Sequence, residues 1–254
     1  PLDQLEELDK WAVSRLNRLV GRIRNAYDNY QFHLIYHDIH NYCAIDLSKL
    51  YIDITKDRLY CERKNDPKRR SAQTAMYLIA SSLIRLIAPI LSFTAEESWS
   101  YLSHRTGDNT GSVFYNEMPA YDEKLCFEEA EKKYEALFEH RDDVMKALEI
   151  ARADKIIGKS LEAKVIIYGD KENPTMKLLE ENKSVLETIF IVSEVVLSYD
   201  KPEGNVFSET ESGISVAVSP AEGEKCIRCW MYKHDTVVDE HGQHLCRRCK
   251  EAVC

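Results

Sequence analysis

The sequence lacks the short motifs that mark most enzymes acting on phosphates, esters or peptides. It has no glycine-rich phosphate loop, no Gly-x-Ser-x-Gly elbow around a nucleophile and no His-Glu-x-x-His pair. Adjacent carboxylates such as Glu96-Glu97 and Asp142-Asp143 fall in segments with helical periodicity, where neighbouring side chains point apart. We therefore expect this chain to bind a partner rather than to make or break a covalent bond.

Long apolar runs are also missing. No stretch approaches the roughly 18 residues that a membrane span needs, and no signal segment is recognisable. We therefore expect a cytoplasmic protein that does not bind membranes. Glycine and proline are scarce, at 9 and 7 of 254 residues, and hydrophobic residues make up 44%. This composition predicts one or two folded domains plus a small module, not a disordered chain.

Acidic side chains outnumber basic ones, and the net charge is −9. This charge argues against a protein that coats nucleic acid generally. The acidic excess is local, because residues 161–224 hold 5 basic and 13 acidic side chains. Residues 1–120 hold 15 of each, and residues 225–254 hold 6 basic and 4 acidic. A polyanion would therefore be bound near the two ends of the chain, away from the acidic middle.

Two Cys-x-x-Cys motifs near the end of the chain give the strongest signal for a site. Cys226 and Cys229 are followed, after sixteen intervening residues, by Cys246 and Cys249. Each motif places two thiolates across one tight turn, and four soft ligands suit one tetrahedral Zn²⁺. With four protein ligands the metal would be structural. Two disulfides or a thioredoxin-like redox pair are weaker readings, because they need a secreted protein or a βαβ setting.

Other cysteines and histidines near these motifs leave alternatives open. His234, His241 and His244 lie between the motifs and could each replace a cysteine, although the regular spacing favours ligation by sulfur alone. Cys254 is expected to be a spare thiol. Cys61 is one of the isolated cysteines and is expected to be a small core or surface residue.

The first two-thirds of the chain has helical periodicity. Apolar residues three and four apart predict a helix after an Asp3–Glu6 capping box and a second helix over residues 32–47, with a turn near 48–60. Further helices are expected from Lys68 to Pro89, after a second capping box at Thr94–Glu97, and over residues 123–155 with Gly158 as a cap.

The pattern becomes alternating after residue 160. Strands are expected at 164–168, 189–192, 195–199 and 214–218, with a short helix after Asn173-Pro174. The sequence therefore predicts a mainly α protein. An antiparallel helical bundle over residues 1–160 is followed by a small α/β unit over 161–222 and a zinc ribbon or knuckle over 223–254.

Two features could contact an anion. Lys68, Arg69 and Arg70 begin a helix, where an anion would relieve their repulsion and use free N–H groups; a solvated charge run is an equal alternative. Trp230 follows a ligand cysteine and could stack on an unpaired base, although it is more often the hydrophobic plug of such a knuckle.

Several segments together resemble isoleucyl-tRNA synthetases of the bacterial type. They are Tyr51–Tyr60, Ala88–Glu97 with the following Trp99, the 144–148 and 157–164 segments, and the Cys-x-x-Cys-Trp and Leu-Cys-x-x-Cys motifs. The resemblance covers almost the whole chain. The His-Ile-Gly-His and Lys-Met-Ser-Lys-Ser signatures of the catalytic domain and the editing domain are absent. We therefore expect a C-terminal fragment that is inactive alone, because it lacks the catalytic domain. The resemblance implies that only the full-length ligase uses ATP.

The resemblance implies that the bundle binds the anticodon stem-loop of isoleucine tRNA, next to the catalytic domain of a full-length, monomeric chain. It also implies that the four cysteines bind zinc. Two other hypotheses remain: a DNA-repair glycosylase relative with a similar zinc finger, and a protein-interaction adaptor that uses the acidic unit. From charge and position, the expected tRNA contacts are Lys64, Lys68, Arg69, Arg70, Lys155, Lys159, Arg228, Trp230, Arg247 and Arg248.

Overall fold

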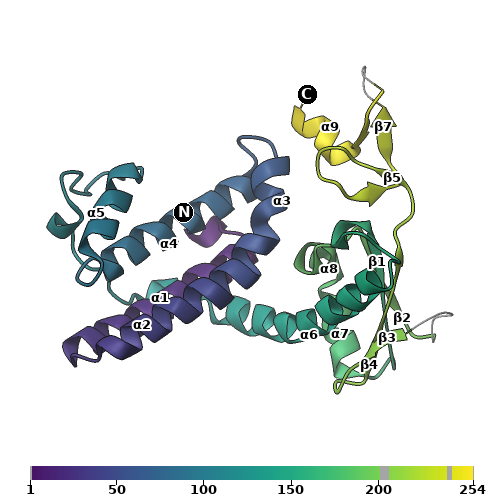
Figure 1. The fold of residues 1–254 in the computed structure, drawn as a ribbon, viewed down its shortest axis with the longest axis horizontal. Helices are drawn as coiled ribbons and strands as arrows, with labels where there is room; N and C mark the ends of the chain where they lie inside the picture. The colour runs from purple at the N-terminus through teal and green to yellow at the C-terminus, as the bar shows by residue number, and fades with distance from the viewer. Residues whose placement is uncertain (1, 201–205, 239–241, 254) are drawn as a thin grey trace. The chain divides into compact units, whose positions relative to one another are not determined.

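The chain divides into two compact units in a computed structural model that describes residues 2–200, 206–238 and 242–253 (Figure 1). The first unit comprises Pro1–Leu59 and Lys64–Lys132. The second comprises Tyr60–Arg63 and Lys133–Cys254. We describe each unit by itself. The domain limits expected at residues 160 and 222 remain predictions.

Helices form the first unit, as the sequence predicts. Two hydrogen bonds fix the direction of α4 beside α1: Glu6 N–H donates to Ser71 Oγ at one end (2.8 Å), and Tyr27 OH donates to the Leu86 carbonyl at the other (2.8 Å). The helices between them run back in the opposite direction. The helices are α1 (Glu7–Asp28), α2 (Phe32–Asn41), the π-helix η2 (Tyr42–Ile52), α3 (Asp53–Cys61), α4 (Pro67–Ile87) and α5 (Ser92–Tyr101).

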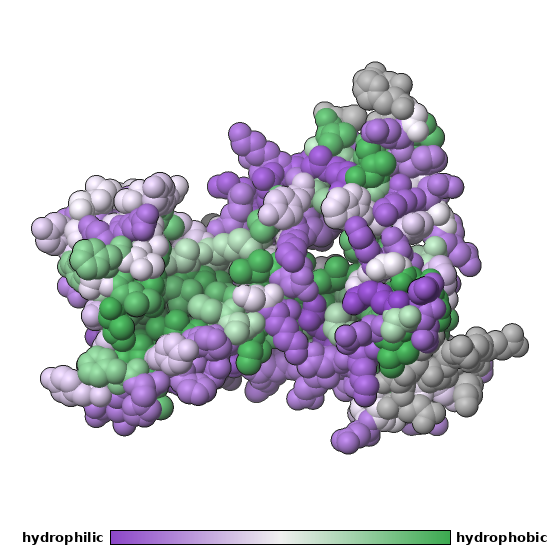
Figure 2. All heavy atoms as spheres, viewed as in Figure 1, coloured by the Kyte–Doolittle hydropathy of each residue, from purple (hydrophilic) through white to green (hydrophobic). Residues whose placement is uncertain are grey.

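The core of this unit follows the predicted apolar stripes. On α1 the stripe is buried throughout, because residues three and four apart share one helix face. The face drawn in Figure 2 also shows a broad hydrophobic area over the helices of this unit. Buried members of the α1 and α4 stripes are Leu8, Ala12, Leu16, Leu19, Ile23, Ala26, Ala72, Ala75, Ile79 and Leu86.

A fully buried carboxylate links four helical segments of the bundle. Asp9 of α1 accepts hydrogen bonds from Tyr51 OH (2.7 Å), Ser71 Oγ (2.5 Å) and Arg58 Nη1 (3.1 Å). These partners come from η2, α4 and α3. A charge removed from water is tolerated only when it is paired and hydrogen-bonded, so this network fixes the register of the helices against α1.

Both predicted capping boxes are wrong. Leu2–Gln4 forms a 3₁₀ turn, and α1 begins after Glu6 without a side-chain cap because the Glu6 N–H is satisfied by Ser71. Likewise α5 begins at Ser92, two residues before Thr94. The neighbouring Glu96 carboxylate accepts from Ser112 Oγ and the Val113 N–H, so it binds a later loop. At α1, a tertiary partner therefore binds the N–H that a local cap would have used.

The turn expected near residues 48–60 is also wrong, because α2, η2 and α3 continue without a break. Tyr42, Leu47 and Tyr51 are buried at spacings of five and four, which suits the wider π-helical turn. The Ser48 hydroxyl donates to the Cys43 carbonyl, five residues back, at 2.7 Å. The dense tyrosines and charges of this stretch therefore lie along a helix rather than in a loop.

The second unit contains most of α6 (Glu128–Ala153) and a four-stranded sheet in the order β2-β1-β4-β3. β1 pairs in parallel with β2 and antiparallel with β4, and β3 pairs antiparallel with β4. Alternate residues of β1 are buried, as expected for a strand. The elements are β1 (Ala163–Gly169), α7 (Pro174–Glu181), α8 (Lys183–Phe190), β2 (Glu194–Ser198), β3 (Val206–Glu209) and β4 (Ile214–Pro220).

One predicted strand of this unit is wrong. Residues 183–190 form α8, which ends at Ile191 in the left-handed conformation (φ 56°). Ile189 and Phe190 are buried, so the apolar run marks the inner face of a short helix. A short apolar run does not by itself distinguish a buried helix from a buried strand.

The end of the chain folds as a small knuckle with two short hairpins. Its elements are β5 (Glu224–Lys225), β6 (Tyr232–Lys233), β7 (Thr236–Val238), β8 (His244–Cys246) and α9 (Arg247–Val253). The structure is therefore mainly α, with a small α/β unit and a cysteine-bearing knuckle. Among the described residues, no helix combines the length and the apolar character that crossing a membrane requires.

Candidate metal centre and nucleic-acid interface

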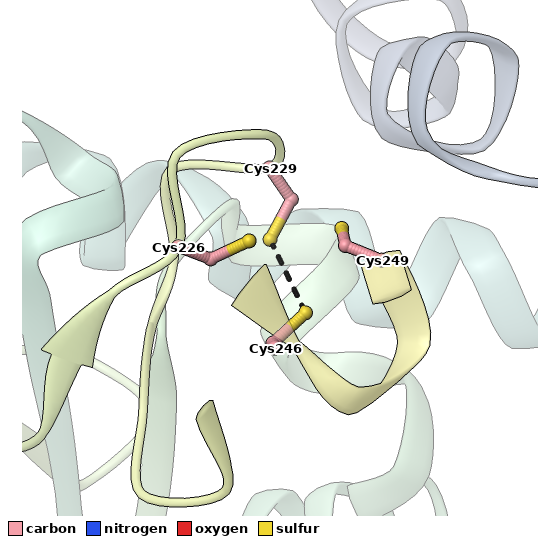
Figure 3. Close-up of side chains that lie close together, drawn as sticks. All are labelled: Cys226, Cys229, Cys246 and Cys249. Atoms are coloured by element: carbon pink, nitrogen blue, oxygen red, sulfur yellow. Dashed lines mark hydrogen bonds between the residues drawn. The ribbon is translucent and has the colours of Figure 1, made fainter. Parts of the chain in front are cut away.

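Four cysteine sulfurs converge in the knuckle, as the spacing predicts (Figure 3). The Sγ atoms of Cys226, Cys229, Cys246 and Cys249 all lie within 4.8 Å of one another, and all four residues are buried. Cys226 follows β5, Cys246 ends β8 and Cys249 lies in α9. The first turn is closed by a hydrogen bond from the Trp230 N–H to the Cys226 carbonyl at 2.9 Å.

The spacing of these sulfurs fits one zinc ion. The Sγ atoms of Cys229 and Cys246 are 3.8 Å apart. With a Zn–S bond of about 2.3 Å, two corners of a tetrahedron are also about 3.8 Å apart. The donor set is four soft sulfurs, which suits Zn²⁺ better than a hard cation. One structural Zn²⁺ therefore fits this site, with every coordination position filled by protein.

The thiol pKa values differ within the cluster. Burial opposes ionisation of Cys226, but hydrogen bonds from the N–H groups of Cys229, Cys246 and Arg228 lower its pKa to about 7. Burial raises the pKa of Cys229 to about 11 and raises that of Cys249 still further, helped by neighbouring sulfurs. A divalent cation at the centre would favour all four thiolates, because it offsets both the burial and their mutual repulsion.

Histidine does not join this cluster among the described residues. His244 Nδ1 lies 3.4 Å from Thr236 Oγ1, and His234 is exposed. His241 and Cys254 lie outside the described residues. The four-sulfur arrangement is therefore the one that the geometry supports.

Cys61 is a part of the knuckle core that the sequence did not reveal. Its side chain is 6% exposed and packs with the four cysteines, and its thiol is 3.8 Å from the Arg228 carbonyl. Arg228 Nη2 in turn donates to the carbonyls of Tyr60 (3.2 Å) and Cys61 (3.4 Å). No local pattern could have shown this contact, because the partners are 167 residues apart.

The predicted RNA-binding arginines of the knuckle already have protein partners. Besides the Arg228 contacts, Arg248 Nη1 lies 3.1 Å from Glu62 Oε1. Arg247 lies 3.3 Å from Glu251 one turn along α9, and its side chain is 78% exposed. Arg228 and Arg248 thus hold the knuckle against Tyr60–Arg63, while Arg247 faces solvent.

The basic start of α4 lies in the first unit. Asp66 is its N-cap, and its carboxylate accepts from the N–H groups of Lys68 (2.8 Å) and Arg69 (3.4 Å). The Asp66 carboxylate therefore provides a negative charge at this helix start, where the sequence left an anion and a solvated charge run as equal alternatives. Lys64, Lys68 and Arg70 are exposed around it, so their side chains remain available to phosphates.

Lys159 and Trp230 meet in the second unit. Lys159 Nζ lies 5.2 Å from the centre of the Trp230 ring, within the range of a cation–π contact. Trp230 is 54% exposed and has a left-handed backbone (φ 64°). The interpretation of Trp230 as the hydrophobic plug of the knuckle is therefore wrong. The arrangement presents an aromatic face and a cation together, which suits an unpaired base.

Lys155 has the helix-ending backbone role that the sequence predicts for Gly158. The helix α6 ends at Ala153, and Lys155 adopts the left-handed conformation (φ 59°) that ends many helices. Gly158 lies close to another side chain: a Cβ there would be 2.9 Å from Glu162 Oε2, so the carboxylate would have to shift. The absence of a side chain lets the Glu162 carboxylate accept the N–H groups of Gly158 (2.9 Å) and Lys159 (3.2 Å).

Two segments of the chain match models of known protein families. Residues 9–167 match the model of the anticodon-binding domain of tRNA ligase, and residues 223–251 match that of the zinc finger found in FPG and IleRS. Isoleucine–tRNA ligases of Syntrophotalea carbinolica, Thermoanaerobacter sp. and Persephonella marina are 44%, 43% and 43% identical. The alignments cover 97%, 100% and 100% of this chain but 26%, 27% and 26% of the relatives. The chain thus spans about a quarter of their length.

Proposed function

Because the chain belongs to the family of anticodon-binding domains of tRNA ligases, we propose that it binds the anticodon stem-loop of isoleucine tRNA. One observation carries this proposal: a single chain matches both the anticodon-binding domain and the zinc finger named for isoleucyl enzymes. The similarity to isoleucine–tRNA ligases over nearly all of the chain supports the choice of amino acid.

The exposed cations of both units supply the affinity in this proposal. Lys64, Lys68 and Arg70 at the start of α4 contact phosphates, which positions the RNA without reading its sequence. In the second unit, Lys159 and Trp230 offer a charge and a stacking surface to an unpaired base. Lys155, four residues before Lys159, adds a further exposed cation. Arg247 is the exposed arginine of the knuckle, whereas Arg228 and Arg248 contribute mainly by holding the knuckle in place.

Zinc has a structural part in this account. When bound, it links the two cysteine turns and so fixes the loop that carries Trp230. The protein residues do the recognition. Isoleucine activation with ATP and its transfer to tRNA belong to the catalytic domain of a longer, cytoplasmic and monomeric ligase, which this chain adjoins.

The glycosylase alternative rests on the finger alone, since that model is also named for FPG proteins. The helical domain over residues 9–167 favours the ligase instead. The adaptor alternative rests only on the acidic residues 161–224. We therefore retain RNA recognition as the function that the chain supports best.

A footprint of isoleucine tRNA tests this proposal. Protection by this chain should centre on the anticodon loop and its stem and should weaken steeply with salt. A replacement of Lys68 and Arg70 by alanine should reduce protection, whereas a Lys171→Ala variant should not, because Lys171 lies in a turn of the α/β unit. Protection confined to the acceptor end, or none at low salt, would refute the proposal.

A further inference from the structure

A cavity of about 430 Å³ opens in the second unit, where the end of α6, the turn after it and the end of β4 come together. Its lining combines the cations Arg152 and Lys155, the apolar side chains of Ile156 and Pro220, and Tyr232 of the knuckle. Binding sites for small molecules have volumes of roughly 300–1,000 Å³, usually with apolar walls and a few placed polar groups. The cavity is therefore large enough for one nucleotide.

The charge of this cavity suits an anion. Glu162 is the acidic residue in the lining, and its Oε2 already accepts two backbone N–H groups, from Gly158 (2.9 Å) and Lys159 (3.2 Å). Lys225 Nζ lies 3.6 Å from Glu162 Oε1. The Glu162 charge is thus offset locally, and the cations of Arg152 and Lys155 remain for a ligand. Arg152 is held in place by its bond to Ser160 Oγ at 2.8 Å.

Lys155, in the lining of this cavity, occupies an unfavourable backbone conformation. Its φ of 59° is one that glycine adopts freely and that a residue with a side chain avoids. The turn is nevertheless well formed, because the Ile156 N–H donates to the Ala151 carbonyl at 2.9 Å. Strained conformations of this kind cluster at functional sites, so a lysine here points to a use for its charge.

Tyr232 provides a fixed aromatic wall. Its N–H donates to Ser193 Oγ at 2.7 Å, which holds the start of β6 to the α/β unit. Lys225 Nζ lies 5.9 Å from the centre of its ring. Two residues earlier in the chain, the Trp230 ring makes the same kind of cation–π contact, with Lys159 Nζ. Alternating aromatic rings and cations are the arrangement by which proteins hold successive unpaired nucleotides.

We propose that this cavity receives one unstacked nucleotide of the bound RNA, next to the nucleotide that stacks on Trp230. The base lies against Tyr232, and its phosphate is bound by Arg152 and Lys155. The proposal rests on the proposed function, because it names the place on the second unit where an anticodon-loop nucleotide inserts. A free phosphate or mononucleotide would use the same cations but would gain nothing from the neighbouring ring of Trp230.

The test combines altered RNA with altered protein. A set of anticodon stem-loops is prepared, each lacking the base of one loop nucleotide, and the affinity of each is measured for the wild type, Tyr232→Leu and Tyr199→Leu. Tyr199 is a half-exposed tyrosine outside the cavity lining and serves as the control. At one loop position, loss of the base should weaken wild-type and Tyr199→Leu binding about tenfold, as stacking contacts do. The Tyr232→Leu variant should bind the intact and the altered RNA equally.

Lys155→Gly gives a second measurement that does not depend on Tyr232. Glycine removes the cation and suits the left-handed backbone, so the variant should fold at least as well as the wild type. Its affinity for the stem-loop should fall, and the salt dependence should lose roughly 0.7 in log–log slope, as expected for one phosphate contact on a single strand. Lys171→Gly should leave both quantities unchanged.

The outcomes separate this proposal from the proposed function. If the wild type does not bind the stem-loop, the function itself is refuted. If it binds, but no loop position couples to Tyr232 and Lys155→Gly keeps the full salt slope, only the cavity proposal is overturned. Equal weakening at every loop position would likewise contradict a single inserted nucleotide. Should Tyr232→Leu lose its zinc or its fold, the Lys155→Gly result decides.

Discussion

Arg248 donates a hydrogen bond to Glu62 over 3.1 Å, which joins the helix that carries Cys249 to a segment 186 residues earlier. The Glu62 side chain is 13% exposed and that of Arg248 is 37% exposed, so the pair is only partly screened by solvent. The two carbonyl bonds of Arg228 lie beside it. The knuckle is therefore held by its own side chains as well as by its metal ligands.

This contact predicts a measurable coupling. Glu62→Gln and Arg248→Ala should each speed the release of zinc to a chelator, because the docked knuckle becomes less stable by about 1 kcal/mol. In a double-mutant cycle the two changes should couple by roughly 0.5–1 kcal/mol. Arg247→Ala is the control. It removes the exposed Arg247–Glu251 ion pair of α9 and should have little effect on zinc release. Independent effects of the first two variants would show that the contact is not stabilising.

Metal removal should affect one part of the chain selectively. A preparation should contain one zinc per chain, and chelation should unfold residues 226–249 while the helices of the first unit persist. Cys249→Ser should do the same, whereas Cys126→Ser should keep the metal, because Cys126 lies in the other unit. Hydrogen exchange of the backbone amides is the measurement. Unchanged protection of the knuckle after zinc removal would contradict the structural role of the metal.

Trp230→Gly should separate stability from binding. Its left-handed backbone costs a residue with a side chain about 1–2 kcal/mol, so glycine should stabilise the turn by up to roughly 1 kcal/mol after loss of the Lys159 contact. Affinity for the stem-loop should nevertheless fall several-fold, because the stacking face is gone. Trp230→Ala should lose affinity without the gain in stability. Retained affinity in both variants would exclude Trp230 as an RNA contact.

The Arg18–Glu131 pair predicts an acid-sensitive contribution to stability in the first unit. Burial disfavours the Glu131 carboxylate, but hydrogen bonds from Arg18 and Ser14 and the charge of Arg18 outweigh it and lower the pKa below the usual 4.5. A depressed carboxyl pKa adds stability that is complete above the unfolded-state pKa and disappears as the pH falls through the folded-state value. Glu131→Gln should therefore lower stability at pH 7 by about 1 kcal/mol.

Urea unfolding between pH 3 and pH 7 measures this effect. The wild type and Glu131→Gln should differ most near neutral pH and converge as the pH falls through the lowered folded-state pKa, since the carboxylate is then protonated in both folded and unfolded chains. Glu128→Gln is the control, because that carboxylate is exposed at the start of α6. A constant difference at every pH would show that the Arg18 contact is not electrostatic.

The parts that the sequence predicted correctly depend on spacing along one element. The apolar stripe of α1 and the four-cysteine knuckle are of this kind, because helix periodicity and the Cys-x-x-Cys turn place their side chains without reference to distant residues. The N-cap of α7 is another, since Asn173 accepts the Thr175 N–H two residues later at 2.8 Å. In each case the local pattern and the tertiary fold agree.

The features that the sequence did not reveal depend on partners far away in the chain. The Asp3–Glu6 capping box does not form, because the Glu6 N–H donates to Ser71 instead. Cys61 packs in the knuckle through contacts with residues more than 160 positions away. The run at 189–192 was ambiguous because burial, not alternation, decides between a short helix and a strand. Lys155 was missed as a helix terminator since glycine is the expected residue there, and its strained backbone has no sequence signal.

The most direct test of the central claim is the affinity of this chain for the anticodon stem-loop of isoleucine tRNA, compared with the same stem-loop carrying one changed anticodon base, at physiological salt. We predict that a single change at a contacted base weakens binding about tenfold, because one stacking or hydrogen-bonding contact is lost. The predicted difference should persist as salt is raised, while both affinities fall together. Equal affinity for the two RNAs at every salt concentration would contradict anticodon recognition by this chain.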